Sequence, residues 1–396
     1  MSRDLLVLIP LALGHLSLFV LIVNVVHALG HRGPTADGLK IALLAGFSIG
    51  SGILAWEAWQ GGLTMWSWPS LLYGIACLST GLFFLPLSTI LLQLRDQPDG
   101  IAGNETSLDL ATSLGKKSLV GSGPHGWMLR LPGNDSFTLS KVECELHLPD
   151  LPAALDGLSL LHISDVHFSP AYSRRFFDAV FEEAGATPAD LVVFTGDLVD
   201  SDEAIEWIVP LFSNLRGRLG SYSILGNHDL EHSPALLCRR LEEAGFTDLE
   251  GRWATLESGG SILALGGTSF PWGPPLPLAD RPGADYKILL SHTPDRFFWA
   301  EKHGFDLMLS GHNHGGQIRF PIVGAVFMPS LYSRRFDRGF FRKNRLTLHV
   351  SQGIGGKHPV RYGCPPEITR LILRTDPSGS PRTSMTSSTN RLQSSV

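Results

Sequence analysis

The chain has 396 residues, of which 43% are hydrophobic and 17% are charged, and its formal net charge at pH 7 is −5. A dedicated nucleic-acid-binding protein would normally carry a clear basic excess, so this charge argues against a nucleic acid as partner. The four cysteines show no metal-type spacing such as Cys-x-x-Cys, so neither a zinc knuckle nor a disulfide scaffold is indicated.

The hydrophobic residues are concentrated near the N-terminus. Leu5–Leu29, Leu39–Trp59 and Trp68–Leu94 are apolar stretches with few charges, each long enough for the ~20 residues that cross a bilayer as a helix. We therefore predict a membrane anchor over residues 1–95, with three transmembrane helices at about 5–29, 39–59 and 68–94. This makes the protein a multi-pass integral membrane protein with the lipid bilayer as a partner. Buried helices of a soluble domain and a cleaved signal peptide are the disfavoured alternatives.

The basic residues near the predicted helices indicate an orientation in the membrane. They lie in the first connection and after the third helix, and they are Arg32, Lys40, Arg95, Lys116 and Lys117. Cytoplasmic loops are the basic ones, so the C-terminal part of the chain is expected on the cytoplasmic side. Arg3, at the amino end, argues the other way.

The remaining chain divides into three segments. Residues 96–135 are rich in Gly, Ser, Pro and Asp without apolar periodicity, which predicts a linker or a weakly ordered extension. Residues 136–375 form the predicted globular domain, opening with a strand pair in Ser136–Leu148. The tail 376–396 has almost no apolar residues and is expected to be disordered.

Short apolar runs alternate with amphipathic segments along the predicted domain. The runs, which we interpret as buried strands, are Leu158–Ile163, Leu191–Thr195, Tyr222–Leu225, Lys287–Leu290 and Leu307–Leu309. The helical segments are Ser173–Ala184, Glu203–Asn214, Pro234–Ala244 and Pro294–Lys302. This alternation favours a layered α/β fold, in which ligands bind at the carboxyl ends of the strands.

A group of ligand-type side chains follows each of these apolar runs. In chain order the groups are Asp165-Val-His167, Gly196-Asp197, Gly226-Asn227-His228-Asp229, His292 and Gly311-His312-Asn313-His314. A lone aspartate at a strand end is usually a turn former, so the prediction rests on the combination of groups. Carboxylate and imidazole ligands together suit Mn, Fe or Zn, and the sequence predicts two divalent metal ions of uncertain identity.

The spacing also assigns chemical roles. Asp165 and His167 can turn toward one cation, and Asp197 can give one oxygen to each of two metals. Asn227, His292, His312 and His314 can complete both coordination shells, which leaves His228 free to act on a substrate. Two metals activate a shared hydroxide for attack on phosphorus, and a histidine oriented by a carboxylate can protonate the leaving oxygen. We assign these last two roles to His228 and Asp200 and predict phosphate ester hydrolysis.

Over Leu158–Leu373 the chain resembles the calcineurin-like metallophosphoesterase superfamily. The pattern D-x-H, G-D-x-x-D, G-N-H-[DE], H, G-H-x-H is matched in full and in order. The resemblance implies a four-layer α/β/β/α sandwich of mixed sheets flanked by helices. It also implies a first metal held by Asp165, His167, Asp197 and His314, a second held by Asp197, Asn227, His292 and His312, and His228 with Asp200 as the acid pair.

The apolar N-terminus and the segment Gly353–Ile368 resemble a membrane-associated branch of this superfamily, some members of which cleave the pyrophosphate of UDP-2,3-diacylglucosamine. A protein serine/threonine phosphatase is disfavoured because Ser201, not arginine, follows Asp200. We expect hydrolysis of a phosphodiester or pyrophosphate, most naturally on a lipid-linked substrate. The alternatives are a broad phosphomonoesterase on soluble substrates and a catalytically silent membrane sensor. The sequence leaves the oligomeric state open.

A basic and aromatic cluster lies late in the chain. Its cations are Arg334, Arg335, Arg338, Arg342, Lys343 and Arg345. A solvated loop and contact with anionic lipid head groups are equally good interpretations.

Overall fold

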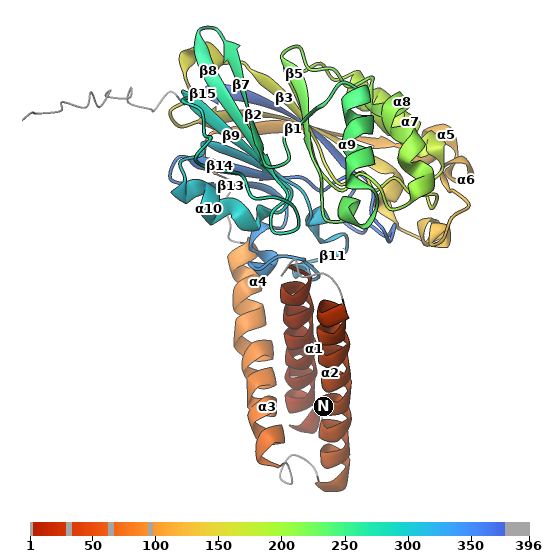
Figure 1. Ribbon diagram of the computed structural model, residues 1–396. Coiled ribbons are helices and arrows are strands. Elements are labelled where there is room, and N and C mark those ends of the chain that lie inside the picture. Colours follow the sequence, from red (N-terminus) through yellow and green to blue (C-terminus); the bar gives the residue numbers. More distant parts are fainter. Residues whose placement is uncertain (1–2, 29–33, 62–66, 94–97, 377–396) are drawn as a thin grey trace, which may run out of the picture.

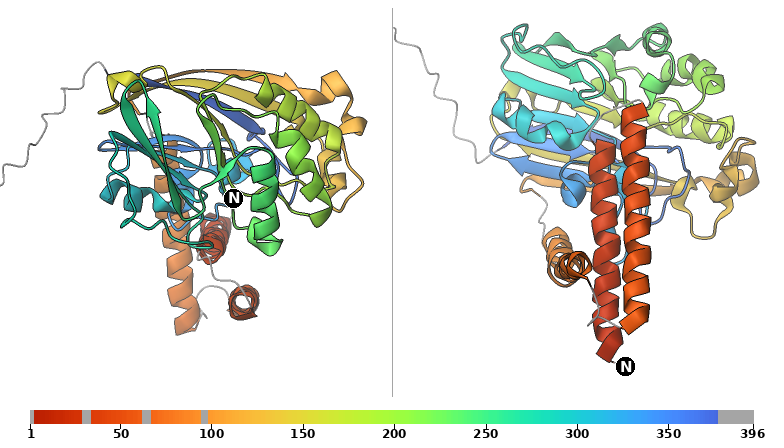
Figure 2. Two further views of the ribbon diagram at one scale, coloured as in Figure 1. Left: turned by 45° about the horizontal axis from the view of Figure 1, so that its top comes forward. Right: turned by 60° about the horizontal axis from the view of Figure 1, so that its bottom comes forward.

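The computed structural model describes residues 3–28, 34–61, 67–93 and 98–376. A bundle of N-terminal helices projects from one end of a layered α/β domain (Figure 1), and it does so in both further views (Figure 2). The predicted disordered tail lies outside the described residues, except for Asp376.

The bundle consists of α1 (Arg3–Ala28), α2 (Pro34–Gly61) and a third rod. This rod begins as α3 (Trp68–Ser79), passes through a π-helical turn (Thr80–Phe84) and continues as α4 (Leu85–Gln93). The inner end of α4 and the C-terminal end of α1 both lie against the domain (Figure 1).

The prediction of three transmembrane helices is wrong for the second of them. Among the described residues, Ile9–Val26 in α1 and Trp68–Leu91 in the third rod are long and apolar enough to cross a membrane. The apolar part of α2 is the shorter Ile41–Ile53. The physical reason is composition, because glycines and serines interrupt the apolar residues at Gly46, Ser48, Gly50, Ser51 and Gly52.

The predicted linker is also wrong where the structure describes it. Strand β1 (Ile101–Asp109) and the short helices α5 (Leu110–Leu114) and α6 (Lys116–Leu119) lie within it. Because β1 is the exposed edge of a sheet, its sequence has no apolar alternation to reveal it. The predicted strand pair in Ser136–Leu148 is a single strand, β2 (Thr138–Leu148), which pairs with β1.

The first of two large sheets has seven strands in the order β1-β2-β15-β3-β4-β5-β6. The strands not yet named are β3 (Ser159–Ile163), β4 (Leu191–Thr195), β5 (Gly220–Ile224), β6 (Thr247–Asp248) and β15 (Glu367–Thr375). From β3 to β6 neighbouring strands are parallel, whereas β15 runs antiparallel to β3. The sheet is therefore mixed.

The second sheet has six strands in the order β13-β14-β10-β9-β8-β7. They are β7 (Arg252–Ser258), β8 (Ser261–Thr268), β9 (Tyr286–Ser291), β10 (Leu307–Ser310), β13 (Gly339–Lys343) and β14 (Leu346–Val350). The inner strands are parallel, and the edge strands β7 and β13 are antiparallel to their neighbours. A separate small hairpin, β11 (Arg319–Phe320) with β12 (Gly324–Ala325), lies toward the bundle (Figure 1).

Three apolar cores hold these layers together. The middle core lies between the sheets and includes Leu160, Val193, Leu265, Ile288 and Leu309. On the outer face of the first sheet pack α7 (Arg174–Gly185), α8 (Ile208–Phe212) and α9 (Pro234–Glu243), and on that of the second packs α10 (Phe297–Lys302). The fold is therefore an α/β fold with two mixed sheets, arranged helix, sheet, sheet, helix.

The five strands predicted from apolar runs and two of the four predicted helices, Ser173–Ala184 and Pro234–Ala244, are present within a residue or two of their expected ends. Each of the other two begins as a 3₁₀ helix, over Asp202–Trp207 and Pro294–Arg296, and continues as a short α-helix, α8 and α10. Helix α7 shows why such segments could be predicted, because it buries a stripe of side chains, Phe176, Phe177, Val180, Phe181 and Ala184.

Candidate metal centre

The predicted ligands come together at the carboxyl ends of strands from both sheets. Asp165, Asp197 and Asn227 follow β3, β4 and β5 in the first sheet, and His292 and His312 follow β9 and β10 in the second. Because the two sheets pack face to face, these strand ends meet although the residues are far apart in sequence. The structure thus brings all the predicted metal ligands into one buried region.

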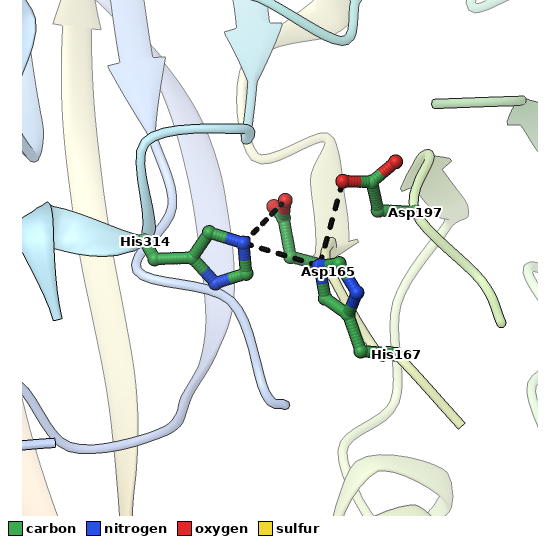
Figure 3. A group of neighbouring side chains, drawn as sticks. All are labelled: Asp165, His167, Asp197 and His314. Atoms are coloured by element: carbon green, nitrogen blue, oxygen red, sulfur yellow. Dashed lines mark hydrogen bonds and ion pairs between the residues drawn. The ribbon is translucent and has the colours of Figure 1, made fainter. Parts of the chain in front are cut away.

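The first cluster contains Asp165, His167, Asp197 and His314, whose ligand-type atoms all lie within 4.8 Å of one another. Figure 3 shows these four side chains pointing toward a common point. His167 Nε2 lies 3.4 Å from Asp197 Oδ2, and His314 Nε2 lies 3.4 Å from Asp165 Oδ1. His167 Nε2 and His314 Nε2 are 3.1 Å apart.

The second cluster contains Asp197, His292 and His312, also with ligand-type atoms within 4.8 Å of one another. His292 Nε2 lies 3.4 Å from Asp197 Oδ2, 3.2 Å from His312 Nδ1 and 3.0 Å from Asn227 Oδ1. Asp197 Oδ2 therefore faces a histidine of each cluster. The sequence predicted one Asp197 oxygen for each metal, whereas here Oδ2 faces both clusters and Oδ1 accepts a hydrogen bond from the His228 amide.

The orientation of the imidazole rings fits metal binding. His292 Nδ1 lies 2.8 Å from the Thr195 carbonyl and His312 Nε2 lies 2.9 Å from the Pro329 carbonyl, so each of these outer nitrogens carries the ring proton. The opposite nitrogens face each other across the cluster and would be free of protons when they bind a metal. Two nitrogen ligands of one zinc-sized ion lie roughly 3 to 3.4 Å apart at bond lengths of about 2.1 Å, which matches the observed separations.

The electrostatics of the centre also favour bound cations. Burial lowers the pKa of His312 to about 3, with help from His292, so its ring is neutral and can act as a ligand. Burial would also lower the pKa of His292, but Asp197 and Asp165 outweigh it and raise the pKa to about 9. The carboxylates therefore favour positive charge at this position, and bound divalent ions would supply that charge.

The ligand loops have a strained backbone. Asp165, His167, Asp197, His312 and His314 all have positive φ, between 47° and 70°, which non-glycine residues rarely adopt. Two motif glycines allow the close packing that maintains these loops. A side chain at Gly311 would overlap the Asp165 carboxylate, and one at Gly226 would overlap that of Asp197.

His228 and Asp200 lie where an acid pair is expected. His228 Nδ1 is 2.9 Å from Asp200 Oδ1, and the side chain of His228 is 23% exposed, whereas that of Asp200 is 5% exposed. The other oxygen, Asp200 Oδ2, lies 3.0 Å from His167 Nδ1. His228 Nε2 is thus left for a substrate, while Asp200 also orients a ligand of the first cluster.

Sequence reasoning missed two residues that support the centre. Asp229 ends one of the ligand-type groups but has no role predicted from the sequence, yet its buried carboxylate accepts hydrogen bonds from the amides of Gly226, Asp197, Leu198 and Val199. Its place in the G-N-H-D motif was the available signal. Trp272, with its ring centre 4.8 Å from that of His312, comes from a loop in which no motif was visible.

Residues 158–316 match the family model of the calcineurin-like phosphoesterases. This segment therefore resembles the calcineurin-like phosphoesterases, and it contains all the predicted metal ligands. The protein is a metallophosphoesterase hydrolase, with buried His and Asp clusters that are consistent with a dinuclear metal centre.

Three relatives show the same resemblance. The chain is 28% identical over 277 residues to an uncharacterized metallophosphoesterase, YkuE of Bacillus subtilis, covering 66% of this chain and 94% of that protein. It is 27% identical over 290 residues to the UDP-2,3-diacylglucosamine pyrophosphatase LpxG of Chlamydia trachomatis, covering 58% of this chain and 88% of that protein. It is 30% identical over 264 residues to a transmembrane protein with metallophosphoesterase domain of Danio rerio, covering 59% of this metallophosphoesterase and 57% of that relative.

Proposed function

We propose that this metallophosphoesterase is anchored in a membrane and cleaves a phosphodiester or pyrophosphate bond of a lipid-linked substrate. The observation that carries the hydrolytic part is the arrangement of Asp197, His228 and Asp200. One carboxylate faces both ligand clusters, and a half-buried histidine beside them is held by a second carboxylate.

Two sets of residues would hold the two metal ions. Asp165, His167, Asp197 and His314 would hold one divalent ion, and Asp197, Asn227, His292 and His312 the other. When bound, such a pair supplies a nucleophilic hydroxide and neutralises the charge on phosphorus.

Proton transfer falls to His228. Asp200 contacts Nδ1 of His228 and orients the ring so that Nε2 faces outward. The His228 imidazolium then gives its proton to the departing oxygen.

The membrane part of the proposal rests on the helices and on relatives. Ile9–Val26 and Trp68–Leu91 can each span a bilayer, and the Danio rerio relative is a transmembrane protein. The Chlamydia relative acts on a pyrophosphate that carries acyl chains, which supports a lipid-linked substrate class. We retain the cytoplasmic side for the catalytic domain as part of the proposal, because the basic residues that follow the third rod, Arg95, Lys116 and Lys117, favour it.

The test is hydrolysis by the full-length protein in detergent, after chelation and reloading with Mn²⁺. Bis-(p-nitrophenyl) phosphate and p-nitrophenyl phosphate are compared, with His228→Ala as the test variant and His303→Ala, at the end of α10, as the matched control. We expect metal-dependent cleavage that prefers the diester and falls about 10²- to 10⁴-fold in His228→Ala only.

Two other outcomes identify the alternatives. Preference for the monoester would indicate a broad phosphomonoesterase. Absence of turnover on both esters and on a vesicle-borne lipid pyrophosphate, despite bound Mn²⁺, would favour a catalytically silent sensor. Equal turnover of soluble and vesicle-borne diesters would contradict the lipid-linked substrate.

A further inference from the structure

A cavity of about 1370 Å³ lies between the helical bundle and the catalytic domain. One wall is formed by α1, the π-helical turn and α4, and the other by the segments Phe320–Val326 and Tyr332–Asn344 of the domain. These elements meet where the bundle joins the domain (Figure 1). The cavity is separate from the metal centre, because none of the metal ligands lines it.

The cavity forms because α1 and the third rod are in contact near Gly14 and Gly81 and diverge toward the domain. At the contact, a side chain on Gly14 would overlap the Cys77 carbonyl, and one on Gly81 would overlap the Pro10 carbonyl. Glycines thus allow the backbones to meet there. Closer to the domain, larger residues such as Val20 and Leu85 face the open space instead.

The wall formed by α1 has the depth of a membrane leaflet. Leu13, Leu16, Val20 and Leu21 line the cavity and belong to the candidate span Ile9–Val26. From Leu13 to Asn24, which hydrogen-bonds the domain, the helix rises roughly 16 Å. Half of the ~30 Å hydrocarbon core of a bilayer is about 15 Å, so an acyl chain can lie along this wall.

The domain end of the cavity is basic. Arg334, Arg335, Arg342 and Lys343 line it together with a single described acid, Asp99. Lys343 pairs with Glu301 at 3.1 Å. The cavity is therefore apolar between the helices and has an excess of positive charge next to the domain.

Two of these cations donate hydrogen bonds only to uncharged oxygens within the described chain, although carboxylates also act on both of them, Asp337 on Arg334 and Asp376 with Asp99 on Arg342. Arg334 donates to the Val323 carbonyl and to the hydroxyls of Ser88 and Thr89. The nearby Asp337 is itself paired with Arg319 at 2.9 Å.

Arg342 is in a similar environment. It donates to the carbonyls of Asp99 and His147 and to the Thr347 hydroxyl. Burial lowers the pKa of both guanidinium groups, which reflects the cost of holding their charge in a half-buried place. An anion at this end of the cavity would offset that cost.

We propose that the cavity binds one anionic glycerophospholipid of the surrounding membrane, with an acyl chain between α1 and α4 and the phosphate at the rim that includes Arg334 and Arg342. The membrane anchoring of the proposed function is assumed here, but hydrolysis at the metal centre is not. The lipid occupies this cavity as a bound ligand and is distinct from the substrate at the metal centre.

The experiment is native mass spectrometry of the full-length protein released from detergent micelles that contain equal amounts of dioleoyl phosphatidylglycerol and dioleoyl phosphatidylcholine. We expect one retained lipid per chain and at least a tenfold preference for phosphatidylglycerol. The double variant Arg334→Gln with Arg342→Gln should lose the preference, and Val20→Trp, which fills the cavity, should lower retention of both lipids several-fold.

Controls match each change. Arg370→Gln removes a cation that pairs with Glu143 on the first sheet, and Ile49→Trp adds an indole at an exposed position of α2. Both should bind lipid as the unchanged protein does. If Val20→Trp does not fold, Leu85→Trp on the opposite wall gives the same comparison.

Equal retention of the two lipids, or unchanged binding in the cavity variants, would overturn the inference and leave only general lipid contact around the bundle. Hydrolysis of bis-(p-nitrophenyl) phosphate is measured on the same samples. Hydrolysis without selective lipid binding would contradict this inference alone, whereas selective binding without hydrolysis would contradict the proposed function alone.

Discussion

At the scale of single residues, two carboxylates organise the metal centre by using both of their oxygens. Asp197 accepts the His228 amide on Oδ1 at 2.8 Å and faces His167 and His292 with Oδ2. Asp200 holds the Nδ1 atoms of His167 and His228 with separate oxygens. Each carboxylate therefore couples a ligand to the residue proposed as the acid.

Replacing Asp200 by Asn tests this coupling. The amide cannot orient both imidazoles, so we expect kcat on the diester to fall about 100-fold or more and Mn²⁺ affinity to fall about 10- to 100-fold. Kinetics and a metal titration measure the two effects. Asp202→Asn is the control because Asp202 is exposed and pairs only with His232 in the described chain. An unchanged metal affinity in Asp200→Asn would show that His167 does not depend on it.

Gly311 is a second residue whose role can be tested alone. A methyl group there would overlap Asp165 Oδ2 and Ser164 Oγ in a fully buried place. We expect Gly311→Ala to weaken Mn²⁺ binding and to destabilise the domain by about 1–3 kcal/mol through overpacking. Isothermal titration and thermal unfolding report these changes, and Gly283→Ala, where a methyl group meets nothing within 4 Å, should alter neither.

At the scale of elements, sequence patterns predicted several of the buried strands and missed others, together with the exposed β1. Each of β3, β4 and β10 is buried along its whole length, and its sequence is mostly apolar. β1 is mostly exposed and is held by pairing with β2, which its own sequence does not reveal. Strand β15 is mostly buried, and its pairing with β2 joins residues more than two hundred positions apart.

The crossing of α1 with the third rod gives a prediction about the bundle. Because a side chain at Gly81 would strike the Pro10 carbonyl, Gly81→Leu should force the helices apart and lower the unfolding temperature of the full-length protein in detergent. Gly46→Leu on α2, where a side chain meets nothing within 4 Å, is the matched control. Equal unfolding temperatures for the two variants would mean that the crossing contributes nothing to stability.

At the scale of the whole molecule, a short chain of contacts connects the bundle to the metal centre. Asn24 of α1 is 2% exposed, and its side chain bonds the Val326 carbonyl and the Met328 amide. In the same loop the Pro329 carbonyl accepts from the ring of His312. The helix that is proposed to span the membrane thus holds the loop that orients a metal ligand.

We expect Asn24→Leu to loosen this loop. Two buried backbone groups would lose their partner, at a cost of about 1–3 kcal/mol each. Hydrogen exchange in residues 321–332 should become faster in the full-length protein, and Mn²⁺ affinity should fall. Ser17→Ala, which removes a hydroxyl bonded only to the Leu13 carbonyl of its own helix, should leave both unchanged. If exchange is equally slow in Asn24→Leu, the bundle does not hold the loop.

The chemistry of this protein could be predicted from local features of its sequence. The ligand types, their order and their positions after apolar runs are local properties, because a strand end and the loop that follows it lie within a few residues of each other. That information was enough to predict Asp165, His167, Asp197, Asn227, His292, His312 and His314 as metal ligands and His228 with Asp200 as the acid pair, and the structure places them together.

How these local segments meet could not be predicted from their own sequences. The pairing of β1, β2 and β15, the facing of the two sheets, the support from Asp229 and Trp272 and the cavity beside the bundle all depend on contacts between residues far apart in sequence. Such contacts form because whole surfaces are buried against one another. The free energy of this burial cannot be predicted from the residue pattern of any single segment.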